Sequence, residues 1–132
     1  IFRLSDVILC KAEIENNLNG PAAALPYLNQ IRARAGAPEY GKHNRFPAPS
    51  TKEAMNDAIL KERGYELVFE FQRRADLIRF GKYEEVVNAH LKKLGIAQPT
   101  NVTSSLRYFP YPLNDAQLNP NLAAENPSRL PK

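Results

Sequence analysis

Several classes of protein are excluded by what this sequence lacks. Its single cysteine, Cys10, rules out a framework of disulfide bonds. No apolar run approaches the roughly 20 residues of a membrane-spanning helix. The run from Val7 to Cys10 has four. Tryptophan is absent, and the six glycines form no phosphate-binding loop. The chain therefore has neither a disulfide scaffold, nor an apolar membrane span, nor the usual nucleotide-binding motif.

What is present is the composition of one globular domain. The 132 residues are 43% hydrophobic and 24% charged, which excludes a disordered chain. The net charge of +4 is spread along the sequence, because basic and acidic residues are interleaved. The only basic stretch with aromatic residues, 42–46, is interpreted as a solvated loop. We therefore expect no nucleic-acid partner.

Proline is the abundant residue, and its distribution divides the chain. The eleven prolines lie between 21 and 49 or between 99 and 131, so a long helix can occupy the interval between them. For residues 1–36 we expect a helical hairpin. Its first helix, Leu4 to Leu18, is predicted to be mostly buried, with Cys10 as a small buried hydrophobic residue. Its second helix is predicted from Pro21 to Ala35, with Pro26 kinking or delaying its first turns. The inward-facing residues predicted there are Leu25, Leu28, Ile31 and Ala35.

The remainder of the chain is predicted to be a loop, two helical segments and a tail. Residues 37–50 are expected to form a loop, and Ser50 begins a Ser-x-x-Glu capping box. Residues 51–95 are predicted to hold a long helix, bent near Phe71 to Arg74, and an amphipathic helix from Lys82 to Leu94. His90 lies on the apolar stripe of that second helix and is interpreted as a core histidine. Residues 96–132 are predicted to be a proline-rich irregular tail, except for a turn of helix at Asp115 to Leu118. The predicted class is all-α, with tetratricopeptide-like helical hairpins.

Three glutamates, Glu62, Glu66 and Glu70, recur at every fourth residue and lie on one stripe of a helix. Such carboxylates could serve a glycosidase or a hard metal ion. The favoured interpretation is a structural ion-pair network, because nearby arginines match the acids almost one for one. Arg63 is paired with Glu66, Glu70 with Arg73 or Arg74, and Asp76 with Arg73 or Arg79. Arg32 and Arg34 are available to complete the set. The network is predicted to comprise Glu62, Arg63, Glu66, Glu70, Arg73, Asp76 and Arg79.

No catalytic residue or cofactor is predicted from the remaining side chains. His43 and His90 have no second ligand at metal-binding spacing, so no metal site is expected. Ligand-binding residues are unknown at this level. The candidates are the ring-bearing side chains of the loops, because rings stack on sugars: Tyr40, His43, Phe46, Tyr108 and Tyr111.

Four ordered segments resemble one protein family, the SusD/RagB family. They are Arg3 to Glu13, Leu28 to Gly36, Ile59 to Gly81, and the closing segment from Phe109 to Pro127. Two residues depart from the family pattern. Phe71 stands where the family often has glycine, and Arg74 stands where an aromatic residue is common. Because a bulky Phe71 removes the easy bend after Glu70, the sequence leaves open whether the long helix is continuous at this point.

The resemblance implies a surface-exposed lipoprotein of the bacterial outer membrane, of the kind found in Bacteroidetes. Such proteins capture glycans, or in some members peptides, and cover a SusC-like TonB-dependent transporter. The lipid-bearing cysteine and signal would lie upstream of Ile1 and hold the protein at the membrane. Such proteins bind without cleaving, and this chain would be mainly the helical scaffold. The alternative is a stand-alone helical protein–protein interaction module that binds no nutrient. A glycosidase that uses Glu62 and Glu70 is the third hypothesis.

Overall fold

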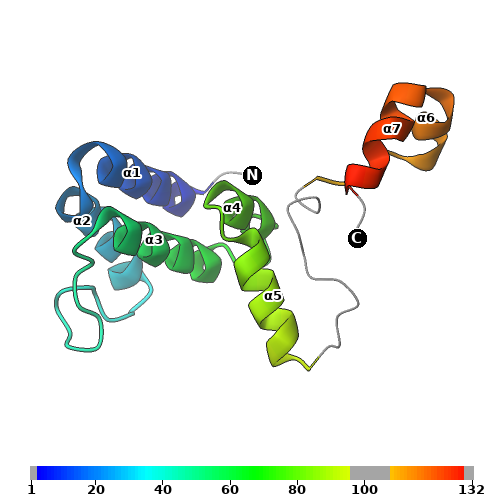
Figure 1. The fold of residues 1–132 in the computed structure, drawn as a ribbon. Coiled ribbons are helices and arrows are strands. Elements are labelled where there is room, and N and C mark those ends of the chain that lie inside the picture. The colour runs from blue at the N-terminus through cyan, green and yellow to red at the C-terminus, as the bar shows by residue number, and fades with distance from the viewer. Residues whose placement is uncertain (1–2, 96–107, 130–132) are drawn as a thin grey trace. The chain divides into compact units, whose positions relative to one another are not determined.

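The computed structural model describes residues 3–95 and 108–129. These residues contain seven α-helices, and the only β-type pairing among them is an isolated bridge between His43 and Phe46. The prediction of an all-α fold is therefore confirmed. The chain divides into two compact units, Ile1–Asp76 and Leu77–Lys132, each described by itself (Figure 1). No helix in the described part of the chain is long and apolar enough to cross a membrane.

The first unit begins with the predicted helical hairpin, formed by α1 (Leu4–Asn19) and α2 (Pro21–Arg34). One residue, Gly20, connects the two helices at φ 89°, a conformation that residues with a Cβ rarely adopt. Pro26 neither delays the helix nor ends it, because α2 starts at Pro21 and continues past Pro26. Leu28 and Ile31 are in the core as predicted. Leu25 is only half-buried, and Ala35, beyond the last turn, is exposed.

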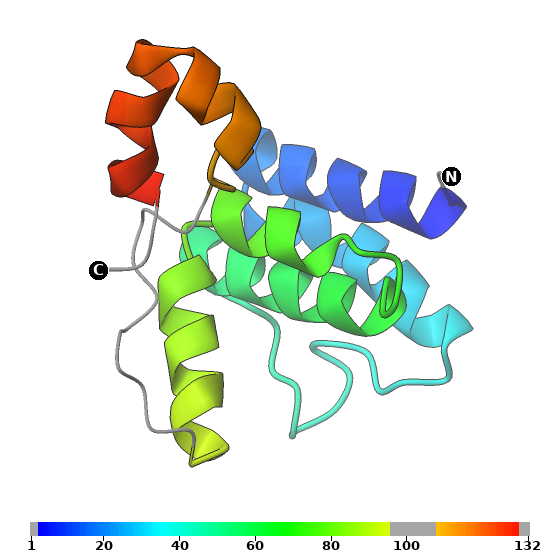
Figure 2. The same cartoon turned by 90° about the vertical axis from the view of Figure 1, so that its right-hand side faces the viewer.

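The prediction that α1 is mostly buried is wrong for this chain. Its buried residues are Ser5, Leu9, Ala12 and Asn16, which form one face. Several apolar residues of the helix are exposed instead, among them Leu4 and Leu18, and Cys10 is exposed as well. The reason is that α2 and the next helix both pack against the same side of α1, as the two views show (Figures 1 and 2). Apolar residues all around a helix predict burial on every side, whereas in the described part of the first unit α2 and α3 cover only the inner side of α1.

The third helix, α3 (Lys52–Glu66), begins one residue later than the capping box predicts. Thr51 is the N-cap, and its hydroxyl oxygen accepts a hydrogen bond from the Ala54 backbone N–H at 3.1 Å. Thr51 rather than Ser50 therefore caps α3, because its hydroxyl is the one that reaches a free N–H of the first turn. Met55 and Ile59 place the centre of α3 in the core.

The break after α3 lies close to the predicted bend. α3 ends at Glu66, and α4 (Arg73–Arg79) begins after a turn in which Phe69 and Phe71 have φ values of 64° and 61°. Positive φ is uncommon for a residue with a Cβ and costs of order 1 kcal/mol or more. Phe71 therefore does not prevent the bend. It adopts, at some cost, the backbone conformation that glycine adopts freely.

The amphipathic helix of the second unit is α5 (Tyr83–Lys93), close to its predicted bounds. None of its residues is buried, and His90 is exposed, so the interpretation of His90 as a core histidine is wrong. His90 lies in the last turn together with Lys92 and Lys93. Basic side chains are favourable there because the carbonyl end of a helix carries partial negative charge.

The predicted turn of helix at Asp115 to Leu118 is confirmed as part of a longer helix. The prediction of an otherwise irregular tail is wrong for residues 120–129, and residues 96–107 and 130–132 lie outside the described part of the chain. Two short helices, α6 (Leu113–Leu118) and α7 (Pro120–Arg129), pack against each other. Pro112 is the N-cap of α6 and Pro120 is the first residue of α7. Proline is tolerated at a helix start, because its missing N–H would have no partner there. Pro112 and Pro120 therefore mark the starts of helices, whereas irregular chain was predicted at both positions.

Candidate functional site

The three glutamates, two in α3 and Glu70 in the turn after it, are held by arginines from other parts of the chain. Glu62 is bound by Arg32 of α2, with Nη1 of Arg32 2.6 Å from Oε2 of Glu62. Both side chains are only 6% exposed. A buried arginine and carboxylate are each costly to remove from water, so either side chain requires the other in place. This pair fixes α3 against α2.

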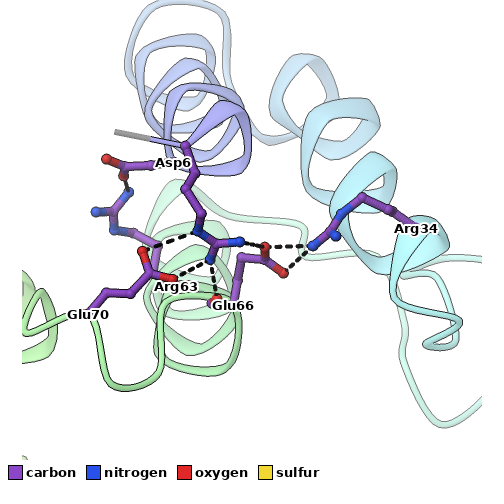
Figure 3. Close-up of polar contacts among 6 residues, drawn as sticks. Asp6, Arg34, Arg63, Glu66 and Glu70 are labelled. Carbon is purple, nitrogen blue, oxygen red and sulfur yellow. Dashed lines mark hydrogen bonds and ion pairs between the residues drawn. The ribbon is translucent and has the colours of Figure 1, made fainter. Parts of the chain in front are cut away.

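Glu66 and Glu70 share Arg3, and Glu66 also binds Arg34 (Figure 3). Arg34 Nη2 lies 2.6 Å from a carboxylate oxygen of Glu66. Arg3 lies between the two acids, 3.1 Å from Glu66 Oε1 and 2.6 Å from Glu70 Oε1. It also donates to the backbone carbonyl of Glu66 at 2.6 Å, at the end of α3. Arg3 was not among the predicted members of the network, since it precedes α1 and lies more than sixty residues from its partners.

Arg63, predicted to pair with Glu66, is bound to different acids. Its guanidinium donates to Asp6 at 2.7 Å and to Asp76 at 2.8 Å, and the side chain is 4% exposed. Glu13 lies 3.9 Å away. Burial alone would lower the pKa of Arg63, but its hydrogen bonds to Asp76 and Asp6, together with their negative charges, outweigh burial and raise that pKa. Arg63 therefore joins α1, α3 and α4 within the first unit.

The two remaining arginines of the predicted network have other contacts. Arg73 Nη1 donates to the backbone carbonyl of Leu60 at 2.7 Å and crosses α3 at Gly64. A Cβ at Gly64 would lie 2.8 Å from that Nη1, so the glycine makes room for the arginine. Arg79 lies over the ring of Phe80, 4.6 Å from its centroid. Arg73 is thus anchored to a helix backbone, where a carboxylate partner was predicted.

Cys10 is exposed overall, but its sulfur lies beside the side chains of Arg63 and Asp6. Its Sγ lies 3.7 Å from Arg63 Nη1 and 3.8 Å from Asp6 Oδ1. Burial raises the pKa of the thiol, and Arg63 only partly offsets that increase. A raised pKa disfavours the thiolate, which is the nucleophilic form of cysteine.

The loop 37–50 is fixed to α2 by two polar side chains. The amide of Asn29 makes two bonds with the backbone of Tyr40, accepting at 2.8 Å and donating at 2.9 Å. Nε of Arg32 donates to the carbonyl of Pro38 at 2.7 Å. The loop also closes on itself, because the Gly41 N–H donates to the Phe46 carbonyl at 2.7 Å. A segment without regular secondary structure is therefore held in one conformation.

The same Arg32 supports the aromatic rings of the loop. Its guanidinium carbon lies 4.6 Å from the centroid of Tyr40 and 4.8 Å from that of Phe46. The two rings meet edge to face, with centroids 5.8 Å apart, and the His43 ring lies 6.1 Å from Phe46. The structure therefore brings three of the predicted ligand-binding candidates together.

A groove of about 500 Å³ separates this loop from α3. Its apolar lining comes from Tyr40, Phe46, Pro47 and Pro49, and charged side chains line it at Arg45, Asp57 and Lys61. A mainly apolar hollow with a few polar groups is the usual form of a small-molecule site. The other two candidates belong to the second unit, where Tyr108 is exposed and Tyr111 is half-buried.

No metal centre is built by the described residues. Among 3–95 and 108–129, no group of three or more His, Cys, Asp or Glu side chains lies close enough together to hold a metal ion. His43 Nδ1 accepts a hydrogen bond from the Arg45 backbone N–H at 3.1 Å.

Sequence reasoning missed the asparagines that position the site. Asn29 anchors the loop, and Asn16 of α1, fully buried, donates to the Lys52 carbonyl and to Asn56 Oδ1, both at 2.8 Å. Asn16 thereby fixes the start of α3, where the loop ends. The available signal was its place on the stripe of Ser5, Leu9 and Ala12, where a polar residue has to find a partner in the core.

The fold and the site together define a helical scaffold that holds one anchored aromatic loop. Comparison with known proteins gives the family. The SusD family model matches residues 1–128, and the chain belongs to this family. No solved structure matches the chain significantly.

Relatives of known name support this membership. SusD-like protein P25 of Formosa agariphila is 39% identical over 91% of this chain and 22% of its own length. SusD-like protein P38 of the same organism is 37% identical over 66% of the chain and 18% of its own length. The starch-binding protein SusD of Bacteroides thetaiotaomicron is 27% identical over 93% of the chain and 20% of its own length. The chain spans about a fifth of the length of these relatives.

Proposed function

We propose that this chain is the helical scaffold of a nutrient-binding protein at the bacterial outer surface. The ligand would be a glycan, or in the alternative a peptide, and the protein would act with a SusC-like TonB-dependent transporter. Attachment to the outer membrane would be through a lipid anchor upstream of these residues. The observation that carries the proposal is the family match over residues 1–128, together with a relative named as starch-binding.

The chemistry of the described residues favours binding over hydrolysis. A glycosidase needs one carboxyl group as an acid and a second as a base or nucleophile. Glu62 is buried in a pair with Arg32, and Glu70 is paired with Arg3. Both carboxyl groups are therefore occupied by arginines, and the Glu62 side chain, only 6% exposed, is out of reach of a substrate. We therefore assign a structural role, and no catalytic one, to Glu62 and Glu70.

Within the chain, the groove beside the loop 37–50 is the proposed place of ligand contact. Tyr40 and Phe46 supply apolar ring surface of the kind that sugars stack on. Arg45, Asp57 and Lys61 supply hydrogen-bonding groups beside it. Because Asn29 and Arg32 already fix the loop, little conformational entropy would be lost on binding.

Binding by the full-length protein tests this proposal. A glycan array and a peptide pool would identify the ligand, and calorimetry would compare the wild type with Phe46→Ala. Loss of one stacking ring should weaken binding by about 3- to 10-fold, since such a contact contributes about 0.5–1.5 kcal/mol. Tyr65→Ala is the matched control, because Tyr65 is an exposed aromatic of the same unit that does not line the groove.

Each outcome separates the hypotheses. Unchanged affinity of a correctly folded Phe46→Ala protein would remove the groove from the ligand site and leave the scaffold role. Failure to bind any glycan or peptide, with no transporter recovered in a pull-down, would favour the stand-alone interaction module. Hydrolysis of a bound glycan that is lost in Glu62→Gln and Glu70→Gln would favour the glycosidase.

A further inference from the structure

Two positively charged side chains line the groove beside the loop 37–50, and neither has a partner among the described residues. Arg45 belongs to the loop and Lys61 to α3, so the two cations line the groove from both of its sides. Within residues 3–95 and 108–129, no hydrogen bond or ion pair engages either side chain. Both residues are exposed, so they can contact a bound molecule without first leaving a protein partner.

Nearby cations of the same unit are neutralised by carboxylates. Arg32, which supports the rings of the loop, lies 2.6 Å from Glu62. Lys42 of the loop lies 2.8 Å from Glu39. The described lining of the groove, in contrast, has two cations against one carboxylate, Asp57, and therefore an excess of positive charge. A hollow lined in this way attracts an anionic ligand.

The apolar part of the groove offers room for a sugar ring beside these charges. Phe46 directly follows Arg45 in the sequence, and both side chains line the groove. On the side of α3, Ala54 and Ala58 precede Lys61 by about two turns and about one turn. Their short side chains leave space along the helix. A sugar ring that stacks on Phe46 would thus have one cation on the side of the loop and another on the side of α3.

We propose that the groove selects glycans that carry acidic groups, carboxylates or sulfates, and that Arg45 and Lys61 bind those groups. The inference rests on the proposed function and adds the chemical class of the ligand. Guanidinium and ammonium groups donate charge-assisted hydrogen bonds to either anion, and such bonds are about twice as strong as neutral ones. A glycan is favoured over an acidic peptide, because the described residues contain no strand to which an extended peptide could add.

Binding of chemically matched glycans by the full-length protein tests the proposal. An array presents maltoheptaose and other neutral glycans, oligogalacturonate as a carboxylated glycan, and carrageenan oligosaccharides as sulfated ones. Calorimetry then compares each acidic glycan that binds with its carboxyl-reduced or desulfated form. The acidic form should bind about 10-fold more tightly, since two charged contacts are lost together when its anionic groups are removed.

Substitutions in the groove test the roles of its charged residues. Lys61→Gln and Arg45→Gln should each weaken binding of the acidic glycan by about 2- to 5-fold, the range for exposed charge pairs, and leave the affinity for its neutralised form unchanged. Asp57→Asn should strengthen binding of the acidic glycan by about 2-fold, because it removes a like charge. Damage to the fold cannot produce such a gain. Lys11→Gln is the matched control, since Lys11 is an exposed cation of α1 that does not line the groove.

The opposite results distinguish this inference from the proposed function. Binding of neutral glycans at least as tightly as acidic ones would overturn the inference and leave the nutrient-binding role in place. Failure to bind any glycan or peptide would overturn both, and preference for an acidic peptide would overturn the assignment to glycans. Selectivity for acidic glycans that survives the loss of Arg45 and Lys61 would exclude the groove as its source. An equal loss of affinity in Lys11→Gln would show attraction to overall charge alone.

Discussion

Two groups of arginine–carboxylate pairs along α3 use the same chemistry in different surroundings. The pairs of Arg32 with Glu62 and of Arg63 with Asp76 are buried, with side chains only 4–6% exposed. The pairs of Arg3 and Arg34 reach the surface, where these arginines are 38% and 59% exposed, although the Glu66 side chain that both contact is only 7% exposed. In the buried group each charge depends on its partner, because water cannot reach the site to take the partner's place. In the surface group water and salt compete with the partner. The buried group should therefore determine the docking of the helices.

The largest loss of stability is expected on removal of Arg63. The substitution Arg63→Met leaves Asp6 and Asp76 without the guanidinium that joins them. Breaking a buried pair from one side costs about 3–5 kcal/mol, and here two acids lose the same guanidinium. Urea unfolding of the protein measures the loss. A change smaller than that of the surface substitution described below would contradict the distinction between the two groups.

The next largest effect is expected at Glu62. Glu62→Gln leaves Arg32 buried without a counter-charge and should lower the free energy of unfolding by about 3 kcal/mol. Replacing both partners, as Arg32→Met with Glu62→Leu, should restore much of that stability, since apolar residues of similar volume fill the space. The double variant should nevertheless be cut faster by protease in the loop 37–50, because Arg32 also holds Pro38 and both rings. Equal protease resistance would contradict the anchoring role of Arg32.

The smallest effect is expected at Glu70, the matched surface position. Glu70→Gln removes one of the contacts of Arg3, which keeps its bonds to Glu66. The urea midpoint should fall only slightly, and the difference from the wild type should disappear at about 1 M salt, where screening acts within a few ångströms. A salt-independent difference would show that this pair behaves like the buried ones.

Local patterns predicted the helices well and their surroundings poorly. The starts and ends of α1, α2 and α5 follow from periodicity and from Gly20, and all lie within two residues of prediction. The exposure of Cys10 and His90 could not be predicted, because it depends on which faces find a neighbour. The helix after Pro112 was predicted only as a turn, and the helix that begins at Pro120 was missed. Proline is both a helix breaker and a helix start, and only its position in the helix distinguishes the two.

The residues of the candidate site were predicted better than the contacts that they make. The loop aromatics Tyr40 and Phe46 and the glutamates of α3 were singled out from the sequence, but the partners of the glutamates were assigned to neighbours in sequence. In the structure the partners come from distant parts of the chain: Arg32 belongs to α2, and Arg3 directly precedes α1. Helical spacing identifies which residues lie on one face of a helix, but it does not indicate which part of the chain packs against that face. The role of Asn29 depends on the path of the loop, which no local pattern specifies.

The position of Arg3 has a consequence for the order of folding. The contacts between α1 and α2 are local, so this hairpin can form early. The bonds from Arg3 to Glu66 and Glu70 join residues 63 and 67 apart, and they require the closure of a long stretch of chain. During synthesis, the turn that contains Phe69 and Phe71 is consequently secured only after α3 has emerged and docked. Arg3 thus secures a turn that lies far along the chain, and it can do so only once α3 has docked.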